Sequence, residues 1–226
     1  MHIIARIHTD LKTKFGIPRQ SGLVASLKGK IIFEPEYRSP DAVRGLAGFS
    51  HIWLIWQFSA AVREKWSPTV RPPRLGGDKR MGVFATRSPF RPNALGLSSV
   101  ILDRIELHPA LGPILWVSGV DLLNNTPIYD IKPYLAYTDS HPEAKGGFTQ
   151  AIDNAPLTVD IRQGQIELIP PGQREALIGV LANDPRPRYQ NDPQRIYGFA
   201  FSRWNVQFKV VEDVLTVLAV TPLENE

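Results

Sequence analysis

The stretch 81–98, MGVFATRSPFRPNALGLS, contains the residue types best suited to binding chemistry. Arg87, Arg91 and Asn93 are interleaved here with prolines and small hydroxyl residues. Because proline fixes the backbone and removes a hydrogen-bond donor, these polar side chains are held in a stiff frame, as a binding site requires. A solvated turn is the alternative, since Pro, Ser and Asn are also common turn formers.

Basic residues cluster in and before this stretch. Between positions 71 and 91 six Lys and Arg residues accompany a single acidic residue, Asp78, and the whole chain has a formal net charge of +4. Clustered cations between prolines suit a phosphate-bearing partner. The alternative is a basic face that contacts only solvent.

Composition excludes several classes of protein. The 226 residues include no cysteine, which excludes disulfides, thiolate metal ligands and cysteine nucleophiles. The five histidines are scattered without metal-binding spacing, so we predict no metal site. The apolar N-terminal stretch is too short for a signal peptide, and the longest apolar run, 52–61, is too short for a membrane span. The glycine patterns of dinucleotide folds and P-loops are missing. We predict a soluble, cytoplasmic protein with no membrane partner.

The first 135 residues or so are expected to be mainly β. They contain short segments rich in β-branched and aromatic residues, separated by Gly, Pro, Asn or Asp, with few amphipathic helical patterns. Such spacing is typical of a barrel or a sandwich. The predicted strands are 3–7, 31–33, 51–58, 82–86, 98–107, 114–120 and 128–131.

A small α+β domain is expected to follow. The polar segment 138–156 is rich in breakers, and we interpret it as a linker or mobile loop. We therefore predict a β-barrel domain over 1–140 and an α+β domain over 157–226. The elements predicted for the second domain are a hairpin of 157–161 with 165–169, a helix over 174–181, and strands over 197–204, 206–211 and 214–220.

Three further segments carry polar groups. Residues 17–22 place an arginine and a glutamine beside a proline, and 120–127 form a turn full of hydrogen-bonding groups. In the third segment, Asp130 and Lys132 share one face if the backbone is extended. These two could form a surface ion pair of only about 0.2–1 kcal/mol, or they could take part in a site.

Six motifs, in order, resemble the TsaA-like family, whose bacterial members, called TrmO, are tRNA methyltransferases. The resemblance covers residues 1–140, and the segment 184–189, DPRPRY, resembles a signature of the second domain in longer bacterial members. The motifs are PRQ at 18–20, GFSHIW at 48–53, RPPRLGG at 71–77, GVFATRSP at 82–89, RPN at 91–93 and DIKPY at 130–134.

This resemblance implies a β-barrel enzyme that works as a homodimer and binds S-adenosylmethionine near the subunit interface. The implied reaction is methylation of N6 of threonylcarbamoyladenosine beside the anticodon, so the implied partner is tRNA carrying that nucleoside. The implied cofactor contacts are Pro18, Arg19, Gln20, Phe58, Ser59, Ala60, Arg87, Leu97, Asp121, Leu122, Leu123 and Asn124.

The chain departs from the family pattern at three places. Ser59 stands where histidine is common, Ala94-Leu95 replaces Pro-Ile, and Asn124-Asn125 replaces Asp-Gly. The first and third departures fall on implied cofactor contacts.

The residue types suit the implied cofactor. Arg19 or Arg87 could hold its carboxylate by a charge-assisted pair. Asn124 could read the adenine edge, while Leu97 and Leu122 could pack on its face.

Methyl transfer to a delocalised nitrogen depends mainly on alignment, and a base could assist it. Asp130 is the candidate base. The residues expected to contact substrate or tRNA are Arg71, Arg74, Arg91, Asn93, Lys132, Arg186, Arg188 and Tyr189.

Two other functions stay open at this point. One is a non-catalytic RNA-binding barrel that uses the basic stretch on phosphates, and the other is a methyltransferase acting on another RNA or on a small molecule. A binding module would not need a small-molecule pocket, so titration with S-adenosylmethionine separates it from an enzyme.

Overall fold

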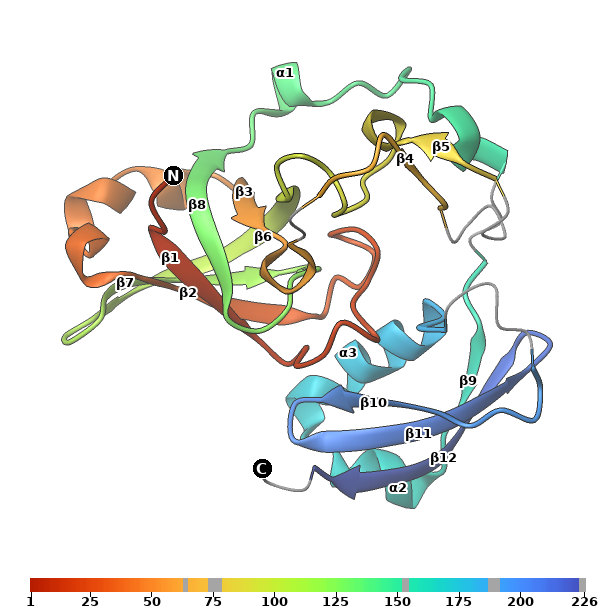
Figure 1. Cartoon of the computed structure of the whole chain (residues 1–226). Helices are drawn as coiled ribbons and strands as arrows, with labels where there is room; N and C mark the ends of the chain where they lie inside the picture. Colours follow the sequence, from red (N-terminus) through yellow and green to blue (C-terminus); the bar gives the residue numbers. More distant parts are fainter. Residues whose placement is uncertain (63–64, 73–78, 152–154, 187–191, 224–226) are drawn as a thin grey trace.

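A computed structural model describes residues 1–62, 65–72, 79–151, 155–186 and 192–223, and Figure 1 shows a barrel beside a smaller sheet with its helices. Six antiparallel strands close the barrel in the order β1-β2-β7-β6-β3-β8. Their bounds are β1 Ala5–Thr9, β2 Lys28–Phe33, β3 His51–Gln57, β6 Leu95–His108, β7 Gly112–Ser118 and β8 Thr126–Pro133. The predicted mainly β fold with a barrel is confirmed.

Strand β3 shows how the apolar run at 51–57 is divided between two faces. Ile52, Leu54 and Trp56 are buried in the barrel, while the alternate residues are only half-buried on its outer face. On that outer face Trp53 lies opposite Ser99 of β6 and Lys132 of β8. The run therefore supplies both a core and an outer apolar face.

A glycine permits the tight packing of the barrel interior next to Trp56. Gly96 of β6 lies directly opposite Trp56, and a Cβ atom there would overlap the indole ring. Because Gly96 has no side chain, the large indole can lie against its backbone inside the barrel.

The second sheet has the order β10-β11-β12-β9, with β9 parallel to β12. Helix α3, Pro171–Ala182, buries Ala176, Leu177, Val180 and Leu181, and it begins with proline, which suits the first turn of a helix. The predicted helix over 174–181 is confirmed. The other elements here are β9 Thr158–Asp160, α2 Gln163–Leu168, β10 Tyr197–Phe201, β11 Trp204–Val211 and β12 Val214–Pro222.

The predicted hairpin over 157–169 is wrong. Its second half is helix α2, and β9 pairs with β12 instead. The Gln165 side chain accepts a hydrogen bond from the Arg162 backbone N–H (3.3 Å) and donates to the Leu218 carbonyl (2.8 Å). Half-buried Ile166 packs against the core. The local capping contact with Arg162, together with the long-range contacts of Gln165 with Leu218 and of Ile166 with the core, favours a helical turn over the strand pattern.

The predicted strand over 82–86 is also mostly wrong. The strand β5 is only Met81–Gly82, paired with β4, Thr69–Val70. The chain then turns into a short 3-10 helix because Thr86 donates both its N–H (3.2 Å) and its Oγ1 hydroxyl (2.9 Å) to the Val83 carbonyl. The described 3-10 turns are Pro35–Tyr37, Pro40–Val43, Leu46–Gly48, Ser59–Ala61, Val83–Ala85 and Gly147–Ala151.

The segment interpreted as a linker, 138–156, is partly regular in the described residues. It begins at the end of α1, Ala136–Asp139, and includes the 3-10 turn Gly147–Ala151. In the part of the chain described by the structure, no helix is long and apolar enough to cross a membrane.

The loop between β1 and β2 connects the barrel to the smaller sheet. Leu11 forms a β-bridge with Phe201, and the Asp10 carbonyl accepts the Ser202 N–H (2.7 Å). Asp10 also accepts from the Gln173 amide (2.9 Å). The second sheet and α3 therefore support the loop that carries the 18–20 motif.

Candidate functional site

A chain of hydrogen bonds runs from the barrel interior to one end of the barrel. The Trp56 indole donates to the Ser98 hydroxyl (2.9 Å), which donates to Asp121 (2.6 Å). Trp56 and Ser98 are buried, and Asp121 lies in the turn between β7 and β8. The two neighbours thus orient the carboxylate of Asp121.

Asp121 has an unusually high pKa for an aspartate. Burial raises its pKa from 3.8 to about 6, because an apolar environment disfavours the charged form. Hydrogen bonds from Ser98 and from the backbones of Asp121 and Ser21, with the charge of Arg87, act in the opposite direction. The barrel end therefore holds a carboxylate that is stabilised only in part, which is characteristic of functional sites.

The loop 17–22 lies against this carboxylate. Its backbone is anchored to the barrel because the Gly22 N–H donates to the Gly119 carbonyl (2.9 Å). Gln20 accepts a hydrogen bond from the Arg87 guanidinium. The two predicted motifs at 18–20 and 82–89 thus meet beside Asp121.

Arg91 holds the Arg87 loop in shape. Its guanidinium donates to the carbonyls of Thr86 (3.0 Å) and Ser88 (3.5 Å) and lies 5.9 Å from the Phe84 ring. The stiff frame predicted for this loop therefore comes from side-chain hydrogen bonds in addition to proline. Arg91 itself acts within the loop.

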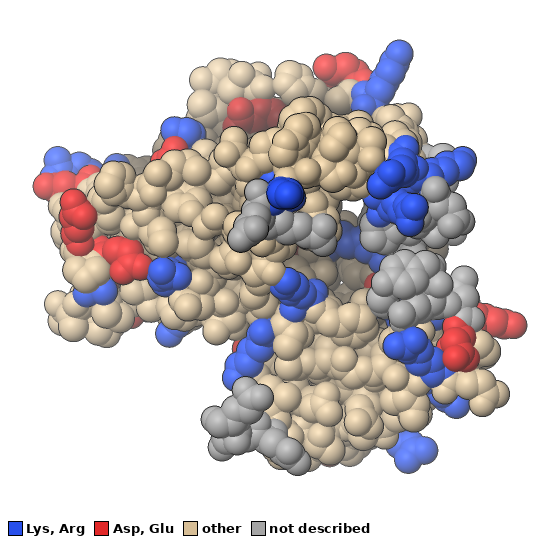
Figure 2. Space-filling view, in the orientation of Figure 1, with Lys and Arg blue, Asp and Glu red and all other residues tan. Residues whose placement is uncertain are grey.

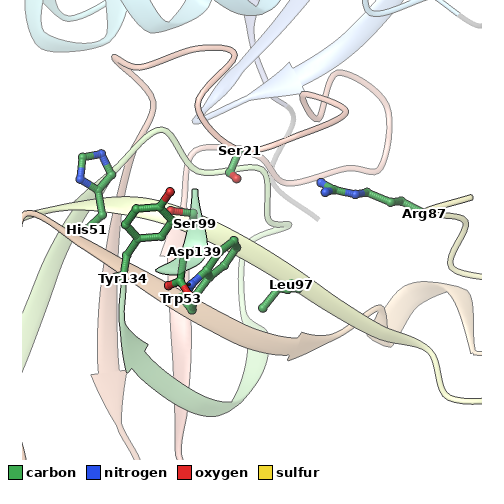
Figure 3. A pocket seen from close by; sticks show the side chains of 8 residues that line it. All are labelled: Ser21, His51, Trp53, Arg87, Leu97, Ser99, Tyr134 and Asp139. Carbon is green, nitrogen blue, oxygen red and sulfur yellow. Dashed lines mark hydrogen bonds between the residues drawn. The ribbon is translucent and has the colours of Figure 1, made fainter. Parts of the chain in front are cut away.

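An open pocket of about 410 Å³ lies on the outer face of the barrel next to these residues. Figure 3 shows Tyr134, Ser99 and Trp53 close together, with Arg87 extending from the opposite side toward the same space. The Trp53 and Tyr134 rings are 5.5 Å apart. The lining residues are Ser21, His51, Trp53, Arg87, Leu97, Ser99, Tyr134 and Asp139.

Asp139 fixes the aromatic wall of the pocket. It accepts hydrogen bonds from the Trp53 indole (2.8 Å) and from the Leu135 N–H (3.0 Å), and the Leu135 bond, followed by the Trp53 bond, lowers its pKa. Trp53, Tyr134 and Asp139 were not predicted as site residues from the sequence. The alternation in 51–57 is the signal that could have placed Trp53 outside the barrel.

The predicted cofactor contacts at 58–60 reach Asp121 only indirectly, through Trp56 and Ser98. The Phe58 ring packs on Trp56 at 4.2 Å, and Trp56 donates to Ser98. Ser59 and Ala60 are exposed, and the Ala60 carbonyl accepts a hydrogen bond from Lys14. Of the predicted cofactor residues, the structure brings Gln20, Arg87, Leu97 and Asp121 together most directly.

Three other predicted cofactor residues serve the turn before β8. Leu122 is fully buried in the core, and the Leu123 carbonyl accepts hydrogen bonds from Thr126. Asn124 accepts a hydrogen bond from the Thr9 N–H (3.1 Å) through its side chain. Pro18 is buried as well, while Arg19 is half-buried.

The remaining predicted residues are distributed over several surfaces. Asp130 and Lys132 form an ion pair of 2.9 Å on the outer face of β8, as their spacing predicted. Arg186 forms a two-pronged pair with Asp184 (2.8 and 3.0 Å), and its side chain is only 10% exposed. Arg71 and Asn93 are exposed. Arg74, Arg188 and Tyr189 lie outside the described residues.

The pocket and the barrel end together suit a small charged ligand that also has a flat apolar part. Arg87 offers a cation, Asp121 an anion, and Leu97, which is 57% exposed, an apolar surface. Among the described residues, no group of His, Asp and Glu could hold a metal ion.

Comparison with known proteins identifies the class. Residues 6–140 match the tRNA-methyltransferase O N-terminal domain, and residues 158–223 match the TrmO C-terminal domain. The chain therefore belongs to the TrmO family.

A named relative and a solved structure each cover nearly the whole chain, and a further relative covers about two thirds of it. The tRNA (adenine(37)-N6)-methyltransferase of Escherichia coli K12 is 39% identical over 97% of this chain and 96% of that protein. A crystal structure of TrmO from Pseudomonas aeruginosa superposes with a TM-score of 0.77 at 32% identity, covering 98% of this chain and 97% of the other. A probable S-adenosyl-L-methionine-binding protein of Pyrococcus abyssi is 33% identical over 65% of this chain and 74% of its own length.

Proposed function

We propose that this protein is an S-adenosylmethionine-dependent tRNA methyltransferase that modifies N6 of adenine 37. The observation that carries the proposal is the convergence of Arg87, Gln20 and Asp121 at one end of the barrel, beside the pocket. These residues come from three segments far apart in a chain of the TrmO family, the motifs at 18–20 and 82–89 and the turn 120–127. An RNA-binding module without catalysis would not need such a small-molecule site.

The residues present fit the cofactor. Arg87 can pair with its carboxylate, and Asp121 can balance its positive charge because the carboxylate is largely ionised above pH 6. The exposed Leu97 side chain can cover its adenine ring. When bound, S-adenosylmethionine supplies a methyl group activated by a sulfonium.

The protein contributes mainly orientation to the reaction. Arg87 and the outer barrel face would hold the methyl donor and the target nucleoside in one fixed relative orientation, which replaces an improbable encounter of two free molecules. As the new C–N bond forms, N6 loses its proton. Asp130 is the proposed acceptor, because it lies on the same outer barrel face as Trp53 and its ion pair with Lys132 holds the carboxylate in position.

The proposed substrate is tRNA whose adenosine 37 already carries the threonylcarbamoyl group. Arg71 is an exposed cation that can contact phosphates, and Lys132 can do so as well because its side chain stays 62% exposed in the pair with Asp130. Arg186 is paired with Asp184 and only 10% exposed, so it is assigned to holding its loop. Residues 1–140 would form the methyltransferase domain and 157–226 the second domain.

The experiment that tests this function uses two preparations of tRNA. The purified protein is incubated with S-adenosylmethionine and with tRNA from cells that lack this protein. In the first preparation adenosine 37 carries the threonylcarbamoyl group, and in the second it does not. Nucleoside mass spectrometry should show methylation at N6 only in the first preparation. Equal methylation of both would identify plain adenosine as the substrate, and no methylation of either would contradict the proposal.

The protein is proposed to be cytoplasmic and to form a homodimer, and an apolar surface supports the dimer. Ile55 lies opposite the exposed Leu97 on the outer face of β3 and β6. We expect the protein to sediment as a dimer at micromolar concentration and Ile55→Asp to sediment as a monomer. Leu107→Asp, an exposed position at the far end of β6, is the matched control. A monomeric wild-type protein would contradict the dimer.

The second domain is proposed to position the loop 17–22. Gly16 has φ +92°, and a Cβ there would lie 2.5 Å from the Phe199 ring of β10. Gly16→Ala should therefore displace the loop, with a loss of about 1–3 kcal/mol shared between stability and cofactor affinity.

The control for that variant is Gly45→Ala. Gly45 has φ +85° but open space around its Cβ position, away from the site. The Gly45→Ala variant should have a lower melting temperature than the wild-type protein but the same Kd for S-adenosylmethionine, measured by calorimetry. If Gly16→Ala also leaves this Kd unchanged, the second domain does not position the loop.

A further inference from the structure

Two aromatic side chains, Trp66 and Phe84, are exposed side by side near the loop that carries Arg87. Trp66 is 51% and Phe84 72% exposed, and their rings stack with centroids 6.2 Å apart and planes 27° apart. Exposure of two large rings is costly for a protein in water. Neither ring takes part in the cofactor contacts described above.

The short β4–β5 hairpin brings these rings together. Thr69 pairs with Gly82 and Val70 with Met81, and the Val83 N–H donates to the Pro68 carbonyl (2.9 Å). Trp66 precedes β4 and Phe84 follows β5, so the hairpin places them on the same side. Buried Val83 anchors the segment beneath them.

The surroundings of the rings are strongly basic. The described residues 65–72 and 79–91 contain six Lys and Arg residues and no acid. Figure 2 shows Lys and Arg gathered at the upper right of the molecule, over the region where Figure 1 places β4 and β5. Arg91 lies 5.9 Å from the Phe84 ring. Aromatic faces among cations are the usual platform for unpaired nucleotides, because bases stack on the rings while phosphates meet the cations.

We propose that Trp66 and Phe84 form a stacking platform for one unpaired base of the tRNA anticodon loop. The inference rests on the proposed function, since the target nucleotide lies in that loop. Phe84 is three residues from Arg87, a separation of at most about 11 Å along the chain, so a base held on the platform lies within a few nucleotides of the methyl-donor site. The platform thereby sets which loop nucleotide reaches the pocket.

The test uses binding of a synthetic anticodon stem–loop RNA, measured by fluorescence anisotropy without turnover. Trp66→Ala and Phe84→Ala should each weaken binding by about 5- to 150-fold, and Trp66→Phe and Phe84→Tyr should retain affinity. The Kd for S-adenosylmethionine should stay unchanged. Leu107→Ala, which removes an exposed apolar side chain at the far end of β6, should have no effect.

Abasic substitutions identify the stacked base. When each loop nucleotide is made abasic in turn, one position should weaken wild-type binding and abolish the further loss caused by Trp66→Ala. Unchanged RNA binding in the alanine variants, or no coupling at any position, would overturn the inference. Conversion of a wild-type dimer to monomers by Trp66→Ala would also overturn it, by assigning the rings to a second copy of the chain. If the wild-type protein methylates no tRNA at all, the proposed function fails. If the wild-type protein methylates tRNA but the alanine variants bind the stem–loop RNA as tightly as it does, only the platform is refuted.

Discussion

Replacing Arg87 with alanine is expected to weaken S-adenosylmethionine binding by about 10- to 150-fold and to abolish tRNA methylation at limiting cofactor, with the fold retained. A hydrogen bond to a charged group is worth roughly 1.5–3 kcal/mol, which converts to that range of Kd. Arg87 is exposed, and the side-chain contact described for it is with Gln20, so its loss leaves no cavity in the core. Isothermal titration calorimetry measures the Kd.

Arg44→Ala is the matched control for this variant. Arg44 is also exposed and pairs with Asp41 in a 3-10 turn of the same domain, away from the pocket. It removes the same charge from the protein, so it corrects for a general change in net charge. An Arg87→Ala protein that binds the cofactor as tightly as the Arg44→Ala protein would remove Arg87 from the site.

Replacing Asp121 with asparagine is expected to make the protein more stable and less active. The folded-state pKa of Asp121 is about 6, against 3.8 as its ordinary value. The folded state therefore binds more protons between these values, and stability falls as pH rises from about 3.8 to 6. Above pH 6 the buried negative charge of Asp121 lowers the free energy of unfolding by up to about 3 kcal/mol. Asp121→Asn should recover this stability at pH 7.5 but not at pH 4.

Cofactor binding should change in the opposite direction. Protonation of Asp121 around and below pH 6 removes its negative charge, so wild-type affinity for the cationic cofactor should fall about tenfold between pH 7 and pH 5. Asp121→Asn should bind weakly and without this pH dependence. Urea unfolding across pH 4–8 measures the effect on stability, and calorimetry across pH 5–8 measures the effect on cofactor affinity.

Asp103→Asn is the control, because Asp103 also accepts a hydrogen bond from a buried barrel serine, Ser118, but pairs with Lys28 on the surface. It should give no gain in stability at pH 7.5 and no change in cofactor affinity. An Asp121→Asn protein that behaves like Asp103→Asn in both measurements contradicts the role given to Asp121.

The barrel strands could be predicted from sequence because their patterns are local. The run at 51–57 alternates between core and outer face, and β-branched residues mark the other strands. The hairpin over 157–169 could not be excluded in this way, since Ile166 and Leu168 have strand-like spacing and the choice of a helix depends on the contact of Gln165 with distant Leu218. Long-range contacts of this kind are not written in a local pattern.

The site shows the same division. Arg87 and Gln20 could be found because their motifs frame polar groups with proline, but their direct contact depends on the folding of two loops 67 residues apart. The raised pKa of Asp121 depends on burial that only the closed barrel creates. Trp53 and Asp139 were missed because their contact joins β3 to a short helix beyond β8.

The most direct test of the central claim is nucleoside mass spectrometry of tRNA from cells lacking this protein. We expect N6-methylated threonylcarbamoyladenosine to disappear while threonylcarbamoyladenosine itself remains. Expression of the wild-type protein should restore the methylated nucleoside, and expression of the Arg87→Ala variant at the same level should not. Persistence of the methylated nucleoside in the deletion cells, provided that no second enzyme forms it, would contradict the claim.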